Sequence, residues 1–512
     1  MSDPQVGSLE FWAAKTPGKP AIIHDSTVLT YQDWNDRADR LAGALVKHGL
    51  GPGDHVGVRL HTGAGWAIAH RAFGKLGVVQ VSVNWRLTPS EAAYILRDSG
   101  AAGLICDDAD VSGWDELDLP FLLTVGQPAG SSRLRMEDLL DEGDLERRYG
   151  PVNPPTVIYT AGTTGHPKGV PPADPATIDL QRLARYRAAL LNNPPIPDQV
   201  RALMTLPVHH AAGPLVASLT MERGGCLIML DRYDPEKVLA LIDEHKAQTW
   251  LAVPTMLLRL QALPPDVVAK YDLTSLEALS VGAAPVPAPL KLWIATLLGK
   301  DVLWESYGCT EAGMVTVLPP EDLTRKTGSS GRPYPAVEVK IVDLDWNEVP
   351  PGVDGDIAVN SPAAFRGYLG QRPLGNDLLR DGYYRTGDIG HLDDDGYLYV
   401  TDRGSDMIVA GGTNIYPAEI EKVLVEHPDV VDAAVIGVPE PDFGEQPLAI
   451  VVASPGSAPT LAELVAFASQ RLARYKLPRQ LELVDELPLS PTGKILKTEL
   501  RKTYRAKYQV PA

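Results

Sequence analysis

The stretch YTAGTTGHPKGV, residues 159–170, holds three threonines, three glycines, a proline and a lysine in twelve positions. TVIY (156–159) in front of it predicts a strand that leads into a loop. Glycines let a backbone approach a ligand closely, and hydroxyl and ammonium groups are donors for phosphate oxygens. The spacing differs from the loop G-x-x-x-x-G-K-[ST], because Lys168 lies between a proline and a glycine. Composition alone leaves two interpretations, a phosphate-binding loop and a plain surface turn.

Strands alternate with helices on both sides of this loop. Short apolar runs predict strands at 55–60, 78–83, 103–106, 201–206, 226–230, 249–253 and 278–281. Residues 31–49 and 235–246 predict helices, and the first has one apolar stripe made of Trp34, Ala38, Leu41, Ala42, Leu45 and Val46. This alternation predicts an α/β fold with parallel sheets and helices on both faces.

The pattern changes after about residue 335. Closely spaced strands at 337–343, 355–360 and 397–402 predict a β subdomain. Beyond it, helices at 417–427, 461–475 and 495–504 and strands at 433–438 and 448–454 predict a small, mobile α+β C-terminal domain. TDRGSD (401–406) is the expected boundary, which gives a large N-terminal domain over 1–402 and a small domain over 403–512.

Composition limits the partners of the chain. Its 512 residues exceed what one core usually supports, and a formal charge of −18 disfavours nucleic acid and anionic lipid. The three cysteines have no C-x-x-C spacing, which disfavours a structural zinc site or a disulfide framework. No leader with a basic start and an apolar stretch is visible. No apolar run approaches the ~20 residues that span a bilayer. We therefore expect a cytoplasmic protein without integral membrane contact. The sequence leaves a monomer and a homodimer open.

Five motifs carry a resemblance that covers nearly the whole chain. They are YTAGTTGHPKG (159–169), YGCTEAG (307–313), GYYRTGD (382–388), GGTNIYPAEIE (411–421) and LPLSPTGKILKTELR (487–501). In this order they resemble the motifs of the adenylate-forming superfamily, and the chain is identified as a member of its acyl-CoA synthetase branch, the fatty-acid or aryl-CoA ligases.

The resemblance implies a reaction in two halves. A carboxylate and ATP, with Mg²⁺ as cofactor, give acyl-AMP and pyrophosphate, and CoA then takes the acyl group and releases AMP. The first half brings two anions together, so the site must supply positive charge and positioning. The implied partners are a small carboxylic acid, ATP and CoA.

The resemblance also assigns roles to residues in the nucleotide site. Lys494 would bridge the acid and the α-phosphate as a catalytic residue, Thr310 would bond the α-phosphate, and Glu311 would ligate Mg²⁺. Tyr307 would cover the adenine, and Asp388 would accept hydrogen bonds from the ribose. The implied ATP- or AMP-binding residues are Thr160, Gly162, Thr163, Thr164, Gly165, Lys168, Ala283, Ser306, Tyr307, Gly308, Asp388 and Arg403.

A further set of roles concerns the acid, the thiol and the hinge. The resemblance places Gly411 and Gly412 against pantetheine, and Arg86 either on the CoA phosphates or in a helix-cap salt bridge. Ser405 takes the hinge position. The implied acyl-binding residues are His210, Gly282, Ala284 and Gly313. Their small side chains, and the lack of an acid in LPVHHAAGP (206–214), favour a hydrophobic acid over an α-amino acid.

Three departures from the family pattern are visible. Ala161 stands where relatives have serine, Ser405 stands where they have Asp or Lys, and VPPADP (170–175) replaces a Thr-His pair. A lost donor to a charged group costs about 1.5–3 kcal/mol if it is used in the transition state. Two alternatives stay open: an acyl-AMP ligase that loads a carrier protein, and a degenerate member that binds nucleotide without catalysis.

Overall fold

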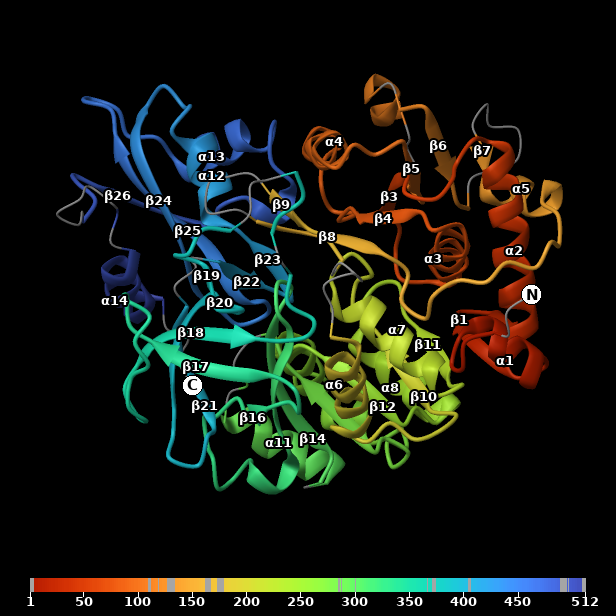
Figure 1. Ribbon diagram of the computed structural model, residues 1–512. Coiled ribbons are helices and arrows are strands. Elements are labelled where there is room, and N and C mark those ends of the chain that lie inside the picture. The colour runs from red at the N-terminus through yellow and green to blue at the C-terminus, as the bar shows by residue number, and fades with distance from the viewer. Residues whose placement is uncertain are drawn as a thin grey trace.

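A computed structural model gives the fold, which contains four sheets (Figure 1). It describes residues 4–108, 112–117, 119–126, 134–161, 167–172, 179–283, 286, 288–299, 301–365, 367–370, 374–403, 407–488, 495 and 497–508. No helix in these ranges is both long enough and apolar enough to cross a bilayer.

The largest sheet has nine strands and is parallel through its centre. In spatial order its strands are β16 (Arg332–Pro333), β15 (Gly313–Leu318), β14 (Leu303–Cys309), β13 (Ala278–Val281), β12 (Thr249–Ala252), β10 (Arg201–Met204), β11 (Cys226–Met229), β1 (Pro20–His24) and β2 (Thr27–Thr30). The strands from β14 to β1 pair in parallel, and both edges are antiparallel.

Helices cover both faces of this sheet. Apolar residues of α8 (Pro235–His245), α9 (Pro254–Gln261) and α11 (Ala288–Leu298) pack on one face. On the other face lie α6 (Leu180–Asn192) and α7 (Ala212–Glu222). The short helix α10 (Pro265–Val268) and the 3₁₀ turn η2 (Pro320–Asp322) lie in connections.

The second parallel sheet has seven strands. In spatial order they are β7 (Leu134–Arg135), β6 (Phe121–Thr124), β5 (Gly103–Cys106), β3 (His55–Arg59), β4 (Val79–Ser82), β8 (Thr156–Ala161) and β9 (Pro167–Val170). The helices α1 (Leu9–Lys15), α2 (Tyr31–Lys47), α3 (Ala64–Leu76) and α5 (Met136–Glu142) share one core cluster, whereas α4 (Pro89–Asp98) and η1 (Ser112–Leu117) belong to another.

Two smaller five-stranded sheets follow. The first contains β17 (Glu338–Val342), β18 (Gly355–Asn360), β19 (Leu379–Arg380), β20 (Tyr383–Leu392) and β21 (Leu398–Arg403). The second contains β22 (Ile408–Ala410), β23 (Thr413–Ile415), β24 (Val430–Glu440), β25 (Gly444–Ala453) and β26 (Gln480–Val484). Its helices are α12 (Pro417–Leu424), α13 (Leu461–Ala468), η3 (Arg474–Lys476) and α14 (Lys497–Lys507).

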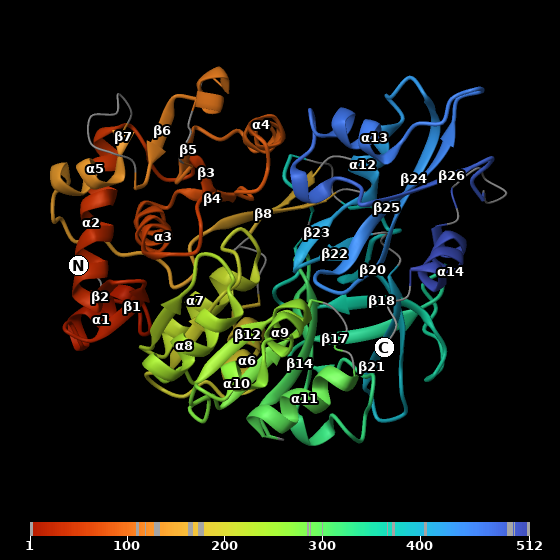
Figure 2. The ribbon, with the colours of Figure 1, turned by 180° about the vertical axis from the view of Figure 1, so that it is seen from behind.

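The apolar cores divide the chain at the same place as the sheets. Each hydrophobic cluster of buried side chains in the described ranges lies either before residue 403 or after residue 407. Figure 2, the view from behind, shows the C-terminal strands β24–β26 as a body apart from strands β3–β6. The large domain of parallel sheets and the smaller C-terminal domain are as the sequence predicts.

Two local expectations were wrong. The helix expected at 461–475 ends at Ala468, where the amide of Ser469 closes the last turn on Val465. Leu472 and Ala473 beyond it are buried, so tertiary packing overrides the local helical pattern. Val46 was expected on the buried stripe of α2, but it is 49% exposed in the last turn of that helix.

A buried ionic cluster ties the helices of the first lobe together. The side chain of Lys75 on α3 is fully buried. Its Nζ lies 2.8 Å from Glu10 on α1, 2.9 Å from Asp39 on α2 and 2.9 Å from the side-chain oxygen of Asn35. It also donates to the carbonyl of Arg148 at 2.7 Å. Removing one member of such a cluster leaves buried charge uncompensated.

We expect Lys75→Met to lower the free energy of unfolding by about 3–5 kcal/mol, because Glu10 and Asp39 lose their shared cation. Lys47→Met is the matched control: Lys47 is an exposed lysine on α2 that bonds only one carbonyl, and its loss should cost under about 0.5 kcal/mol. Urea unfolding of both variants measures the difference. Equal midpoints would contradict the assignment.

Candidate active site

The strands that flank residues 162–166 pair with each other in antiparallel fashion. Strand β8 pairs with β9, with Thr160 opposite Lys168 and Tyr159 opposite Gly169. This pairing places a hydroxyl and an ammonium group on neighbouring strands at the same end of the seven-stranded sheet. The loop predictions Gly162, Thr163, Thr164 and Gly165 lie outside the described residues.

Glu311 meets this pair of strands from the other large sheet. Thr310 and Glu311 form the turn between β14 and β15. Thr160 Oγ1 donates a hydrogen bond to Glu311 Oε1 at 2.9 Å, and the Tyr368 hydroxyl lies 3.5 Å from the same oxygen. Lys168 Nζ lies 4.9 Å from the centre of the Tyr368 ring, within cation–π range. The structure therefore brings three predicted residues, Thr160, Lys168 and Glu311, into one cluster.

The Glu311 carboxylate has no nearby counter-ion in the described part of the chain, where no Lys or Arg side chain lies within 4.0 Å of it. Burial raises the pKa of its carboxyl, although the hydrogen bonds from Thr160 and Tyr368 act in the opposite direction. Asp388 adds repulsion of the same sign. A buried carboxylate in this state suits a cation, and Mg²⁺ in phosphate sites usually takes one or two carboxylates plus phosphate oxygens.

A second cluster joins Tyr307 on β14 to β20. The Tyr307 hydroxyl lies 2.7 Å from Asp388 Oδ2 and 3.2 Å from Thr386 Oγ1. Burial, followed by the charge of Asp388, raises the pKa of Tyr307 well above its usual value, so the hydroxyl keeps its proton and donates. The two residues expected at the adenine and the ribose are thus in direct contact. Arg403 lies opposite Asp388 across β20 and β21, and its side chain is outside the described set.

Small residues line the approach to these clusters. A Cβ on Gly282, directly after β13, would lie 2.7 Å from the carbonyl of Ser306, so only glycine fits there. Ala283 follows with φ +65°, a conformation that side chains rarely adopt and that often marks functional sites. A Cβ on Gly308 would lie 2.3 Å from the carbonyl of Gly313 on the paired strand. Ala284 lies outside the described residues.

Two histidines follow β10 beside this approach. The rings of His209 and His210 are 4.5 Å apart, and each has a buried nitrogen that no described residue hydrogen-bonds. Burial, with the charge of Arg86 adding to it, lowers the pKa of His210 to about 4, although part of its surface is exposed. His210 is therefore neutral at physiological pH.

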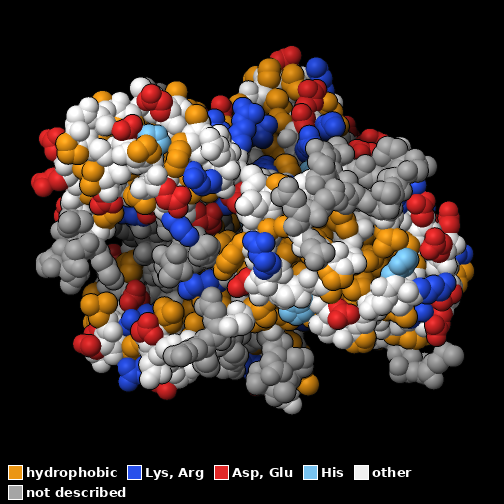
Figure 3. All heavy atoms as spheres, turned by 90° about the horizontal axis from the view of Figure 1, so that it is seen from above, with side chains coloured by type: hydrophobic (Ala, Val, Ile, Leu, Met, Phe, Trp, Pro, Cys, Tyr) orange, Lys and Arg blue, Asp and Glu red, His pale blue; other side chains and the backbone are white. Residues whose placement is uncertain are grey.

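Two glycines of the small domain form a turn that contacts the large domain. Gly411 (φ +59°) and Gly412 (φ +77°) form the turn between β22 and β23. A Cβ on Gly412 would lie 2.9 Å from the Val253 side chain at the start of α9. Beside this turn Arg86 donates to the Thr413 hydroxyl. Arg86 is thus at the domain junction. Figure 3 shows Lys and Arg side chains scattered over the face of the molecule seen from above.

Lys494 and Ser405, the expected catalytic lysine and hinge, lie outside the described residues. The next described residue after Lys494 is Ile495, which packs with Ile436 and Leu448. That cluster uses the face of the C-terminal sheet opposite the one that packs against α12 and α13. Helix α14, which follows, lies on the side of the small domain away from α3 and β4 (Figure 1).

An apolar cavity of about 80 Å³ lies between the nine-stranded sheet and helices α6 and α7. Its floor is made of Ala202, Thr249, Ala278 and Ser280 on neighbouring strands. Leucines of α6 and α7 cover it, and Ser306 and Met314 line the end nearest the nucleotide cluster.

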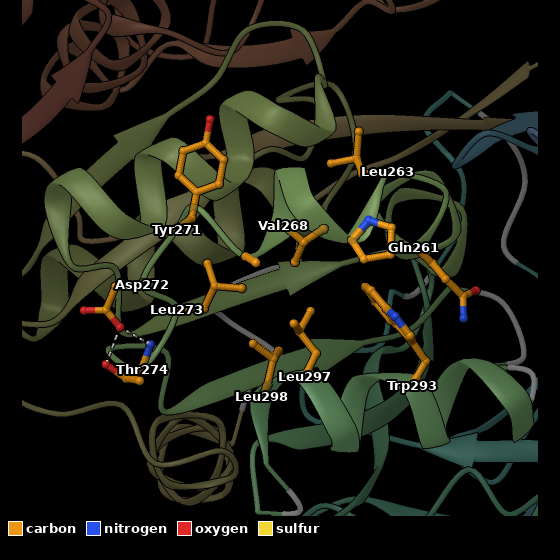
Figure 4. Close-up of a pocket in the computed structure, with 12 residues that line it drawn as sticks. Gln261, Leu263, Val268, Tyr271, Asp272, Leu273, Thr274, Trp293, Leu297 and Leu298 are labelled. Atoms are coloured by element: carbon orange, nitrogen blue, oxygen red, sulfur yellow. Dashed lines mark hydrogen bonds between the residues drawn. The ribbon is translucent and has the colours of Figure 1, made fainter.

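A larger groove of about 460 Å³ lies between α9, α10 and α11 (Figure 4). Trp293 and Leu297 face Leu263 and Val268 across it. None of its lining residues belongs to the five motifs, so this groove is separate from the candidate site.

Sequence reasoning missed two members of the clusters. Tyr368 contacts both Lys168 and Glu311, and Thr386 contacts Tyr307. Thr386 stands inside the GYYRTGD motif, where its hydroxyl was a usable signal. Tyr368 belongs to none of the five motifs; its ring lies 4.9 Å from that of Phe365, whose amide bonds the carbonyl of Glu311.

Comparison with known proteins agrees with this geometry. Residues 9–369 match the model of the AMP-binding enzyme family, and residues 419–494 match that of the AMP-binding enzyme C-terminal domain. The chain belongs to the AMP-binding enzyme family. The membership confirms the resemblance to the adenylate-forming superfamily.

Relatives in this family are ligases of carboxylic acids. A feruloyl-CoA synthase from an Amycolatopsis species is 36% identical, over 96% of this chain and 97% of that protein. A fatty acid–[acyl-carrier-protein] ligase from Streptomyces coeruleorubidus is 33% identical, over 97% of this chain and 95% of that protein. Such relatives support the expected enzyme class, an AMP-forming acyl-CoA synthetase.

Solved structures of one family member differ in their likeness to this chain. A double mutant of o-succinylbenzoate CoA synthetase from Bacillus subtilis, bound with a product analogue, has a TM-score of 0.85 at 29% identity and covers 97% of this chain and 98% of its own. The same enzyme in complex with its acyl-adenylate intermediate has a TM-score of 0.68 at 29% identity, with 98% and 99% covered.

We expect Glu311→Gln to stabilise the ligand-free protein at neutral pH. Because burial raises the pKa of Glu311 in the folded protein, folding disfavours the ionised carboxylate, and Gln removes that cost. The gain is full above the folded pKa of Glu311 and vanishes as pH falls to the ordinary value of 4.5.

Thermal unfolding between pH 4.5 and 8 measures this effect, with the exposed Glu321→Gln as control. A gain for Glu311→Gln that is independent of pH, or that Glu321→Gln reproduces, would contradict the assigned cause.

Proposed function

We propose that this protein converts a hydrophobic carboxylic acid, ATP and CoA into acyl-CoA, AMP and pyrophosphate. In the first step an acid oxygen attacks the α-phosphorus of ATP and pyrophosphate leaves. In the second step the CoA thiolate attacks the acyl carbon of acyl-AMP, and AMP leaves with the electrons of the broken C–O bond. Both steps need cationic groups near the phosphates.

One observation carries the proposal: the meeting of Thr160, Lys168 and Glu311 at the end of β8. A hydroxyl donor, an ammonium group and a buried carboxylate converge where the loop rich in glycine and threonine begins. In this proposal Lys168 and the loop threonines hold the β- and γ-phosphates. Thr310 bonds the α-phosphate, and Asp388 with Arg403 holds the ribose.

Glu311 would hold Mg²⁺, which supplies charge neutralisation to the triphosphate when it is bound. Its buried carboxylate and the absence of a Lys or Arg neighbour among the described side chains support this role. Tyr307, held by Asp388, would cover the adenine. The remaining nucleotide contacts would come from the backbone at Ala283, Ser306 and Gly308.

The second step is supported by the arrangement of the small domain. Gly411 lies against Phe443 and Gly412 against Val253, and in this proposal a side chain at either position would block a narrow passage for pantetheine. Arg86 lies beside this turn, where it could bind a CoA phosphate. The higher TM-score with the product-analogue complex than with the acyl-adenylate complex, 0.85 against 0.68, supports the view that this structure holds the arrangement for thioester formation.

Adenylation would use the other face of the small domain. Ile495 packs on the face of the C-terminal sheet opposite α12 and α13, so the neighbouring Lys494 would reach the nucleotide after a rotation of that domain. We place the domain boundary after residue 402 and the hinge at Ser405. Lys494 would then bridge the acid and the α-phosphate without accepting a proton.

The cavity under α6 and α7 supports a hydrophobic acid. Small floor residues leave space beside Ser306, and leucines cover the rest. His210, neutral because of burial, adds no charge at the entrance. The acid carboxylate would lie near Gly282 and Gly313, with its apolar part directed into the cavity.

A carrier protein is the second candidate acceptor, because the relative from Streptomyces coeruleorubidus is named as a ligase of that kind. Mass spectrometry after incubation with ATP, CoA and a panel of aliphatic and aromatic acids distinguishes CoA from a carrier protein as the acceptor. An acyl-CoA product supports our proposal, and acyl-AMP without thioester supports the carrier reading. If no acid leads to release of pyrophosphate, the result supports the remaining alternative, a protein that binds nucleotide without catalysis.

We expect Lys494→Ala to reduce acid-dependent pyrophosphate release by at least about 100-fold, because the bridging charge is lost. Thioester formation from added acyl-AMP and CoA should stay within about threefold of the parent. Lys502→Ala, at an exposed lysine on α14, is the control and should alter neither step. Normal pyrophosphate release by Lys494→Ala would remove the catalytic role.

We expect Ala278→Val to lower kcat/KM for aromatic and long-chain acids by roughly tenfold, because added methyl groups fill the cavity floor. Acetate, which would not reach the floor, should be used unchanged. Ser280→Ala is a control on the same strand that adds no volume. A uniform loss for all acids would show that the cavity does not hold the acyl group.

A further inference from the structure

Polar side chains of residues 84–91 contact the small domain. No hydrophobic cluster of described residues contains side chains from both domains. The contacts instead include Arg86 with Thr413, and Asn84 with the Tyr475 hydroxyl at 3.4 Å. Polar groups therefore help to hold the small domain in place, and among the described residues Glu91 makes the most hydrogen bonds across the junction.

Glu91 performs two tasks with its two oxygens. As the third residue of α4 it completes a capping box, in which Oε2 accepts from the Thr88 amide at 2.9 Å and from the Thr88 hydroxyl at 3.0 Å. The same Oε2 accepts the Ala473 amide of the small domain at 3.1 Å. Oε1 accepts the Lys476 ammonium of that domain at 2.8 Å.

Lys476 has a second carboxylate in its own domain. Its Nζ lies 2.5 Å from Glu419 Oε2 on α12, and the residue is only 4% exposed. Burial by itself would lower the pKa of Lys476, but Tyr475, Glu419 and Glu91 together hold it above the ordinary value. The ammonium therefore stays charged. A rotation of the small domain would carry the Lys476–Glu419 pair along and break the bond from Lys476 to Glu91.

The placement of Lys476 depends on the early end of α13. The chain leaves the helix at Ser469, buries Leu472 and Ala473, and then forms the short turn η3 that carries Lys476 toward α4. If the helix continued to 475, as its sequence pattern suggests, neither the Ala473 amide nor the Lys476 side chain would be available in this geometry, because a helix interior uses its own amides.

We propose that Glu91 is a positioning residue for thioester formation, which holds the small domain in the arrangement seen here through Lys476 and the Ala473 amide. The inference rests on the proposed two-step function. Glu91 would touch neither substrate. Its charge would favour this arrangement over one in which the small domain turns away, because the ion pair with the Lys476 ammonium and the bond to the Ala473 amide form only here.

The variant Glu91→Gln removes the negative charge of Glu91 and keeps a side chain of nearly the same shape. The Gln oxygen can still cap α4 and accept Ala473, whereas its amide group faces the Lys476 ammonium as a second donor. Glu463→Gln is a matched control, because Glu463 caps α13 by the same bonds to the Thr460 amide and hydroxyl, both at 2.8 Å, and bonds no described residue of the large domain.

The two half-reactions give the first readout. We expect Glu91→Gln to slow thioester formation from added acyl-AMP and CoA about tenfold, and to leave acid-dependent ATP–pyrophosphate exchange equal to the parent or faster. Glu463→Gln should leave both unchanged. The double variant Glu91→Gln/Lys476→Met should lose no more thioester activity than Lys476→Met alone, since the two residues act as one unit.

A distance measurement gives a readout that needs no activity. Cysteines introduced at the exposed Leu292 and Val431, one in each domain, can carry spin labels once the half-buried Cys309 is replaced by Ser in the parent and in every variant, because Cys106 and Cys226 are buried. In the ligand-free parent and in Glu463→Gln, pulsed dipolar spectroscopy should report the separation of this structure as the main population. In Glu91→Gln that population should fall by at least half.

The outcomes separate the two proposals. If the parent makes no acyl-CoA from any acid, the proposed function fails, and the spin-label distances still test the contact. If the parent makes acyl-CoA and Glu91→Gln matches it in both half-reactions and in the distance distribution, the positioning role is wrong. Equal losses in Glu91→Gln and Glu463→Gln would assign the effect to helix capping and overturn the proposal.

Discussion

The hydrogen bond from Thr160 to Glu311 joins the two large sheets at the place where the rest of the site is built. Thr160 ends a strand of one sheet, and Glu311 lies at the turn of a hairpin in the other. A buried carboxylate is costly, so both the hydroxyl bond and the contact with Tyr368 are needed to hold it. The sheets thus meet around a negative charge that a cation-bearing triphosphate would compensate.

Much of the fold followed from the sequence, because its elements obey simple periods. Strand 103–106 and strand 355–360 lie where their apolar runs predict, and helix α8 differs by one residue. The motif residues Tyr307 and Asp388, 81 positions apart, are in contact. The failures have a common cause: the end of α13 and the position of Tyr368 depend on contacts with distant segments, which a local pattern does not contain.

The site therefore divides into a part that motifs specify and a part that packing specifies. The motifs placed Thr160, Lys168 and Glu311 in one cluster, and glycines at 282, 308 and 412 stand where a Cβ would collide. Packing specifies how the domains sit, through residues such as Glu91 whose visible sequence role is to cap a helix. The predictions for Lys494, Ser405 and the loop at 162–166 remain predictions.

The separation of the apolar cores has a thermodynamic consequence. Since each described hydrophobic cluster stays within one domain, turning the small domain transfers little apolar surface between protein and water. Heat-capacity changes follow apolar exposure, so the equilibrium between domain arrangements should carry only a small one. The enthalpy difference between the arrangements would then be nearly constant with temperature, and their ratio would change smoothly on warming, without the curvature that accompanies unfolding.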